Sequence, residues 1–223
     1  MRTFVVLLLL AVGCSPLWSA DLSGRVELYA KGKKKPLNST EVASAVVYFE
    51  PQRSASLTPP AAPVEMATRD KEFVPQVLVI TRGTTVRFPN SDPILHNVFS
   101  VSPGNKFDLG LYQQGPGKTY TFTQPGLVRV FCNVHYSMIG HILVLDTPHF
   151  TQPDGSGAFR LRNLPAGPGT LRVWFDRAQP ESVELQLPHP ESLTVQLEVS
   201  RQRVPAHLNK VGKPYSRGGE RYR

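Results

Sequence analysis

Short apolar stretches bounded by turn signals occupy most of the chain after residue 66. The stretches QVLVI, TTVRF, HNVFSV, KTYTFT, LVRVFC and HILVLD are interrupted by RG, PNSDP and QPG, which are typical of turns. No sustained apolar period of 3.6 residues appears, and the 21 prolines and 17 glycines favour many turns. The pattern therefore predicts an all-β protein.

These strands fall into two groups. Residues 66–147 hold seven or eight predicted strands, which is enough for a sandwich of two sheets. Residues 148–200 hold a second group, in which Phe159 and Leu161 alternate with Arg160 and Arg162. The sequence thus predicts two β-sandwiches, of which the second is the smaller.

The segment before residue 66 divides into strands and a linker. Residues 21–50 hold two strands, which cannot stand alone, and residues 51–65 form a linker of Pro, Ser and Ala. The strands GRVELY and AVVYF, with the later run PDGSGAFRLRNLPAGPGTLRVW, resemble the carboxypeptidase regulatory-like sandwich. This resemblance implies that residues 66–147 are inserted into a sandwich built from both flanks. The alternative is that residues 22–50 extend the central sheet.

A targeting segment is expected at residues 1–20. One arginine precedes an apolar run from Phe4 to Val12 that is too short to span a bilayer, and small and polar residues follow. These features predict a signal peptide cleaved after Ala20. The alternative is a degenerate lipoprotein signal, AVGC, with a lipid on Cys14. Both interpretations predict a periplasmic or otherwise extracytoplasmic protein that touches a membrane only through such an N-terminal lipid.

The basic character of the chain is concentrated at its end. The formal net charge is +8, and the basic tail, residues 201–223, contributes seven Lys or Arg against the single acid Glu220. The tail has few apolar residues and is not expected to form a core of its own. In an exported protein we expect it to be solvated, or to touch anionic lipid or an acidic partner, and we expect no nucleic-acid partner.

Cys132, the only cysteine outside the first 20 residues, begins the sequence CNVHYSM. An exported protein tends to pair or exclude free thiols, so this lone thiol needs an explanation. His135 and Met138 follow it on the loop after the strand VRVFC, and His96 begins the strand HNVFSV. Two imidazoles, a thiolate and a thioether are the ligands of a blue-copper site. The soft sulfurs favour Cu(I), and imidazole suits both oxidation states.

The stretch FVPQVLVITRGTTVRFPNSDPILHNVFSVS, with FCNVHYSMIGHILVLD further on, resembles a cupredoxin of the plastocyanin and amicyanin family. The Cys-x-x-His-x-x-Met spacing is that of amicyanin. The resemblance covers residues 66–147 and implies a Greek-key β-sandwich with one copper ion, whose ligands are His96, Cys132, His135 and Met138. It also implies that Asn97 ties the two ligand loops together. Tyr136 stands where amicyanin has proline, so the ligand loop is expected to be less stiff.

The resemblance implies a one-electron carrier that cycles between Cu(I) and Cu(II) and exchanges electrons with redox partner proteins. Three strong ligands and one weak ligand leave no position for a substrate, so we do not expect an enzyme. Two alternatives remain: a copper carrier or scavenger in the same compartment, and an envelope binding module with the cupredoxin as a secondary element.

Residues that flank the predicted ligands supply two further expectations. His141 follows in the next strand, where we expect a surface residue. A hydrophobic patch through which the redox partner docks is expected from Pro93, Ile94, Leu95, Tyr136 and Ile139.

Overall fold

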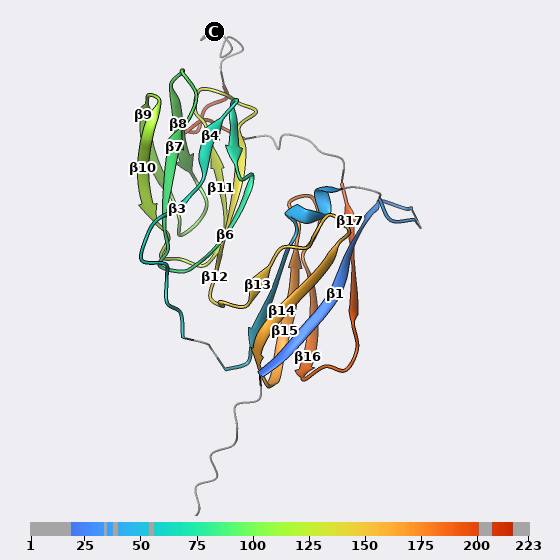
Figure 1. Cartoon of the computed structure of the whole chain (residues 1–223). Coiled ribbons are helices and arrows are strands. Elements are labelled where there is room, and N and C mark those ends of the chain that lie inside the picture. The colour runs from blue at the N-terminus through green and yellow to red at the C-terminus, as the bar shows by residue number, and fades with distance from the viewer. Residues whose placement is uncertain (1–18, 34, 38–39, 54–55, 201–206, 216–223) are drawn as a thin grey trace, which may run out of the picture.

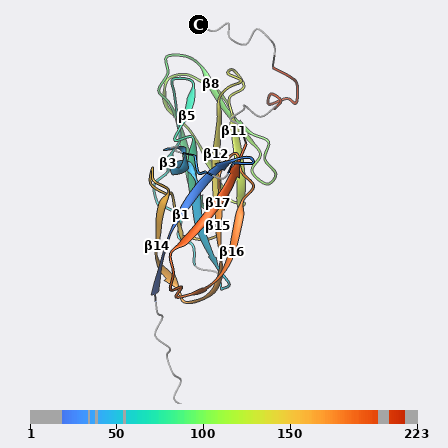
Figure 2. The same ribbon diagram turned by 90° about the vertical axis from the view of Figure 1, so that its right-hand side faces the viewer.

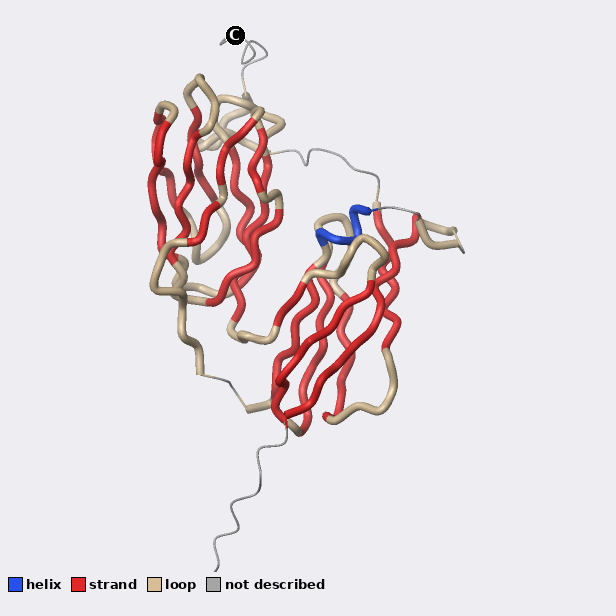
Figure 3. The backbone as a smooth tube through the Cα atoms, viewed as in Figure 1, coloured by secondary structure: helices blue, strands red, loops and turns tan. Residues whose placement is uncertain are grey.

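The computed structural model describes residues 19–33, 35–37, 40–53, 56–200 and 207–215, which form two β-sandwiches (Figure 1). The protein is all-β, as the sequence predicts. The one helix of the described residues is a short 3-10 turn, η1 (Thr40–Ser44), at one end of the second sandwich (Figure 3). No helix in this part of the chain is both long and apolar enough for a membrane span. Residues 1–18 of the expected signal peptide, including Cys14, lie outside the described residues.

The central sandwich consists of two sheets. The first has the order β10-β7-β4-β5, with β3 beside β7, and comprises β3 (Val64–Glu65), β4 (Ala67–Arg69), β5 (Glu72–Val74), β7 (Thr85–Asn90) and β10 (Gly115–Thr121). The second has the order β6-β12-β11-β8-β9 and comprises β6 (Val77–Thr81), β8 (His96–Ser100), β9 (Phe107–Tyr112), β11 (Gly126–Phe131) and β12 (Ile139–Leu145). Phe88, Phe122 and Ile142 belong to the apolar core of this sandwich.

Residues 66–147 hold nine strands in the described chain, where the sequence predicts seven or eight. The stretches named in the sequence correspond to β6, β7, β8, β10, β11 and β12, so β4, β5 and β9 have no counterpart among them. Strands β4 and β5 have three residues each and surround a turn at Asp70 and Lys71. Strands this short carry too few apolar positions to stand out in the sequence. The last two residues of the predicted linker, Val64 and Glu65, form β3 and pair with β7.

The second sandwich combines chain segments from both sides of the central one. One sheet has the order β14-β1-β17 and comprises β1 (Ser19–Ala30), β14 (Ala158–Pro165) and β17 (Leu193–Val199). The other has the order β13-β2-β15-β16 and comprises β2 (Val46–Pro51), β13 (Phe150–Thr151), β15 (Gly167–Trp174) and β16 (Glu181–Leu187). Residues 22–50 therefore pair with strands that follow residue 147, not with the central sheets.

The alternation predicted for β14 is present. Phe159 and Leu161 are buried in the core of the second sandwich, whereas Arg160 and Arg162 are exposed. Strand β1 alternates in the same way and begins at Ser19, which lies opposite Pro165. Cleavage after Ala20 would therefore remove the first two residues of β1.

An apolar contact joins the two sandwiches, which lie one above the other in the view of Figure 2. Val46 and Trp174 of the second sandwich pack with Val77, Leu143 and Leu145 of the central one. The whole of β12 is buried, because Ile142 and Val144 face the central core, whereas Leu143 and Leu145 face this contact and Ile139 packs with Phe99 and Phe131.

His141 is part of this contact, and the expectation of a surface residue was wrong. Only 7% of the residue is exposed, and its ring centroid lies 5.6 Å from that of Trp174. Burial, with the charge of Arg129 in addition, lowers the pKa of His141 to about 4. Its Nδ1 has no hydrogen-bond partner among the described residues.

Candidate metal centre

The predicted ligand loop lies at the end of the central sandwich where β11 ends and β12 begins. The backbone closes this loop on itself, because the N–H of Met138 donates to the carbonyl of His135 at 3.1 Å and the N–H of Cys132 to the carbonyl of Met138 at 3.4 Å. Strand β11 runs antiparallel to β8, with Phe131 opposite Phe99. This register places Cys132, the residue after β11, beside the first residues of β8.

Three of the four predicted ligands converge. The Sγ of Cys132 lies 3.8 Å from Nδ1 of His96 and 3.7 Å from Nδ1 of His135. All three atoms lie within 4.8 Å of one another. In a trigonal site with metal–nitrogen distances of about 2.0 Å and a metal–sulfur distance of about 2.3 Å, nitrogen and sulfur are about 3.7 Å apart. The residues present therefore fit a metal ion.

Met138, the fourth predicted ligand, is buried at the end of the loop and belongs to the same apolar cluster as Cys132. A thioether in this place suits the weak axial ligand of a blue-copper site. Its role as a ligand stays a prediction.

A buried carboxylate orients the first imidazole. Nε2 of His96 lies 2.7 Å from Oδ2 of Asp92, and both side chains are buried. A carboxylate accepts a hydrogen bond from the ring N–H, so Nε2 carries the hydrogen and the lone pair of Nδ1 points toward Cys132. This pair fixes the tautomer that metal ligation requires.

Asp92 is itself held by the backbone of the β4–β5 turn. Burial alone would raise the pKa of Asp92, but the hydrogen bonds from the N–H of Lys71, from His96 and from the N–H of Asp70 hold it below its usual value. The two N–H groups lie 3.0 and 2.7 Å from the carboxylate oxygens. Asp70 and Lys71 both have positive φ angles, which turn the backbone toward Asp92.

Asn97 connects the two ligand segments, as the resemblance to cupredoxins implies. Its Oδ1 accepts a hydrogen bond at 3.3 Å from the N–H of Asn133, the residue after Cys132. Its Nδ2 donates to Asp108 at 2.7 Å and to the carbonyl of Gly110 at 3.0 Å. These bonds confirm the prediction and fix β8, β9 and the ligand loop together.

The second imidazole lies nearer to solvent. His135 is half-buried, and burial, together with the charges of His96 and Lys71, lowers its pKa. Next to it Tyr136 is 41% exposed, and Leu95, beside the other ligand, is 45% exposed. Ile139, which the sequence analysis placed in the same patch, is buried and does not belong to it.

Two parts of the site were not predicted from the sequence. Asp92 lies within PNSDP, which reads as a turn, although its position four residues before His96 was a usable signal. The second part is the contact of the tail with the ligand loop, in which Tyr215 donates a hydrogen bond at 3.0 Å to the carbonyl of Cys132. No periodicity in the tail predicts that contact.

Solved structures similar to this chain are mostly cupredoxins. A purple cupredoxin from Nitrosopumilus maritimus has 22% identity and a TM-score of 0.34, over 37% of this chain and 99% of its own. Amicyanin from Paracoccus versutus has 24% identity and a TM-score of 0.35, over 39% of this chain and 84% of its own. A copper-containing nitrite reductase from Thermus scotoductus has 25% identity and a TM-score of 0.37, over 54% of this chain and 28% of its own.

No protein-family model matches the sequence, and no curated protein matches it. The central sandwich is nevertheless cupredoxin-like, in its two-sheet fold and in the convergence of His96, Cys132 and His135 beside Met138.

Proposed function

We propose that this protein is an exported blue-copper protein that carries one electron at a time between redox partners. The observation that carries the proposal is the convergence of two Nδ1 atoms and one Sγ within 4.8 Å, inside a sandwich whose strands hold them in place. A bound copper ion would supply a centre that alternates between Cu(I) and Cu(II). The residues that would hold it are His96, Cys132, His135 and Met138.

The surroundings of the ligands favour rapid electron transfer. Asp92 fixes the ring of His96, and Asn97 fixes the ligand loop to β8, so the ligands have little freedom to move when the charge of the centre changes. Cys132 and Met138 are buried, and water therefore has little access to the sulfur ligands. These features support a site in which both oxidation states use the same ligand positions.

An enzymatic role is not part of this proposal. A ligand set of two imidazoles, one thiolate and one thioether leaves no coordination position for a substrate, whereas metal-assisted catalysis requires an open position. One similar structure is a nitrite reductase, but the match covers only 28% of that protein.

The proposed route for electrons runs through the exposed edge of His135. Pro93, Leu95 and Tyr136, which flank the ligands in the sequence, are exposed and Ile94 is half-buried, so we assign a small apolar patch to these residues. A lysine at Ile94 should slow electron self-exchange between two copies of the protein by at least about tenfold, because each encounter would bring two added charges together. Leu37→Lys, on the second sandwich, is the matched control. Equal self-exchange rates in the two variants would remove the patch from the proposal.

The test of the function is a visible spectrum combined with metal analysis of the purified protein. One copper per chain, with an intense colour that bleaches on reduction and returns on oxidation, is the expected result. Colourless copper that passes readily to a chelator would contradict electron transfer and favour a copper carrier.

A further inference from the structure

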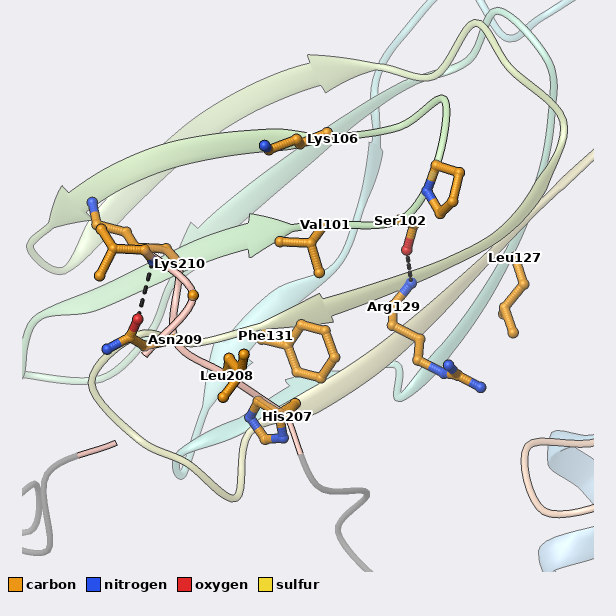
Figure 4. Close-up of a pocket in the computed structure, with 13 residues that line it drawn as sticks. Val101, Ser102, Lys106, Leu127, Arg129, Phe131, His207, Leu208, Asn209 and Lys210 are labelled. Carbon is orange, nitrogen blue, oxygen red and sulfur yellow. Dashed lines mark hydrogen bonds between the residues drawn. The ribbon is translucent and has the colours of Figure 1, made fainter. Parts of the chain in front are cut away.

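The described part of the basic tail, residues 207–215, returns to the metal centre. Residues 207–215 lie against the central sandwich, whereas β17, the last strand before them, belongs to the second sandwich. The ring of His207 stacks between Phe131 and Tyr136, with centroid distances of 4.4 Å to each. Figure 4 shows His207 beside Phe131. Since Phe131 precedes Cys132 and Tyr136 follows His135, the tail contacts the neighbours of two proposed ligands.

Hydrogen bonds fix the tail to the same loop. Tyr215 donates to the carbonyl of Cys132 at 3.0 Å, and its ring meets that of Tyr136 edge-on at 5.1 Å. The N–H of Lys210 donates to the side chain of Asn133 at 3.2 Å. The tail is therefore hydrogen-bonded directly to the backbone of Cys132, a proposed copper ligand.

A groove with an apolar floor and a basic rim lies between the tail and the central sandwich (Figure 4). Val101, Leu127 and Phe131 contribute apolar side chains to it. Lys106 and Arg129 line it from the sandwich and are exposed. The nearby acid Asp108 already pairs with Lys210 at 2.8 Å, so it does not cancel the charge of the other cations.

The described residues of this surface are mostly cationic. Lys106, Arg129, Lys210 and Lys213 give the groove and residues 207–215 four positive charges, against the negative charge of Asp108. The contacts of residues 207–215 thus place cationic side chains at the end of the sandwich that holds the ligands. Charges placed within a Debye length of about 10 Å act together on an approaching ion.

We infer that residues 207–215, with Lys106 and Arg129, form a docking surface for an acidic redox protein, next to the apolar patch around His135. This inference rests on the proposed function, because the surface matters only if the centre exchanges electrons. Complementary charge raises the rate of encounter, and the hydrogen bond between Tyr215 and Cys132 places the docked partner beside the ligand loop.

The experiment uses the full-length, copper-loaded, reduced protein and hexacyanoferrate(III) as an anionic oxidant, with stopped-flow detection of the copper colour. In the variant of this surface, called the tail variant, Gln replaces Lys106, Arg129 and Lys213. In the control variant, Gln replaces Lys31, Lys33 and Lys35, which are exposed after β1 on the second sandwich. Both variants lose three positive charges, so any difference between them reports where the charge lies.

We expect the tail variant to react roughly tenfold more slowly than the wild type at 10 mM ionic strength, a difference that largely disappears at 0.5 M. The control variant should stay within about twofold of the wild type. With a cationic oxidant, tris(phenanthroline)cobalt(III), the tail variant should instead react faster than the wild type. Equal effects of the two variants would show that only net charge matters, and unchanged rates in the tail variant would also overturn the docking surface.

A second measurement does not depend on copper. Hexacyanocobaltate(III) is a redox-inert anion of similar shape to the oxidant. It can be titrated into the metal-free protein while backbone amide signals are followed by NMR. Signals of residues 101–106, 129 and 207–215 should shift, and those of residues 31–35 should not. Shifts confined to other surfaces would refute the docking surface. Absence of copper colour would refute only the proposed function.

Discussion

Acid should weaken the contact between the two sandwiches through His141. Its pKa is about 4 in the folded protein, against about 6.5 for an exposed histidine. The unfolded chain therefore takes up the proton at a higher pH than the folded chain does. Stability contributed by the neutral ring is complete above about pH 6.5, declines as the pH falls from 6.5 to 4, and does not change further below pH 4.

The size of this effect follows from the same difference in pKa. Each pKa unit corresponds to about 1.4 kcal/mol, so about 3 kcal/mol of unfolding free energy should be lost across this range. The groups that surround the ring explain why the pKa of His141 is lowered and not raised. Trp174 covers one side and Arg129 lies opposite His141 in the neighbouring strand, so a proton on the ring would be both buried and next to a positive charge.

The assay is urea unfolding of the metal-free protein from pH 8 to pH 3.5, followed by tryptophan fluorescence. His141→Gln removes the titrating ring, and His189→Gln, on the loop after β16, is the matched control. The free-energy difference between wild type and His141→Gln should change by about 3 kcal/mol between pH 6.5 and 4, whereas the control should follow the wild type. Parallel curves for wild type and His141→Gln would refute the role assigned to burial.

Three other substitutions test separate parts of the structure. Asp92→Asn should speed the loss of copper to a chelator by about 10- to 100-fold, because the ring of His96 loses its orienting carboxylate; an unchanged rate would mean that the carboxylate has no such role. Trp174→Ala should cost about 3–5 kcal/mol of unfolding free energy at neutral pH, and a cost under about 1 kcal/mol would contradict the apolar contact between the sandwiches. Gly117→Ala should lower the thermal midpoint by at least about 4 °C, since a Cβ there would collide with a carbonyl oxygen of β7, whereas Gly32→Ala, at a similar φ in open space, should lower it less.

Most of the metal centre could be predicted from the sequence because three of its four proposed ligands lie close together in the chain. Cys132, His135 and Met138 lie within seven residues, and their thiolate, imidazole and thioether ligands narrow the choice of metal. His96 is distant in sequence, but the resemblance to cupredoxins placed it, and the structure brings its Nδ1 to 3.8 Å from Cys132. The alternating strands of the second sandwich were equally visible, because a face exposed to water shows a period of two.

The features that could not be predicted depend on contacts between distant segments. HILVLD has no clear alternation because β12 is buried on both faces, and no local pattern tells whether the second face meets solvent or another sandwich. The burial of His141 could not be predicted for this reason. The charge of the tail predicts that it is solvated or touches anionic lipid or an acidic partner, but the stacking of His207 on Tyr136 and the hydrogen bond from Tyr215 to the carbonyl of Cys132 depend on the folded ligand loop.

The central claim is that two imidazoles and one thiolate hold a single copper ion, and X-ray absorption of the oxidised, copper-loaded full-length protein tests it most directly. We predict two nitrogen neighbours at about 2.0 Å and one short copper–sulfur distance, and the sulfur contribution should be lost in Cys132→Ser. A spectrum of the wild-type protein that contains only nitrogen and oxygen neighbours would contradict the claim.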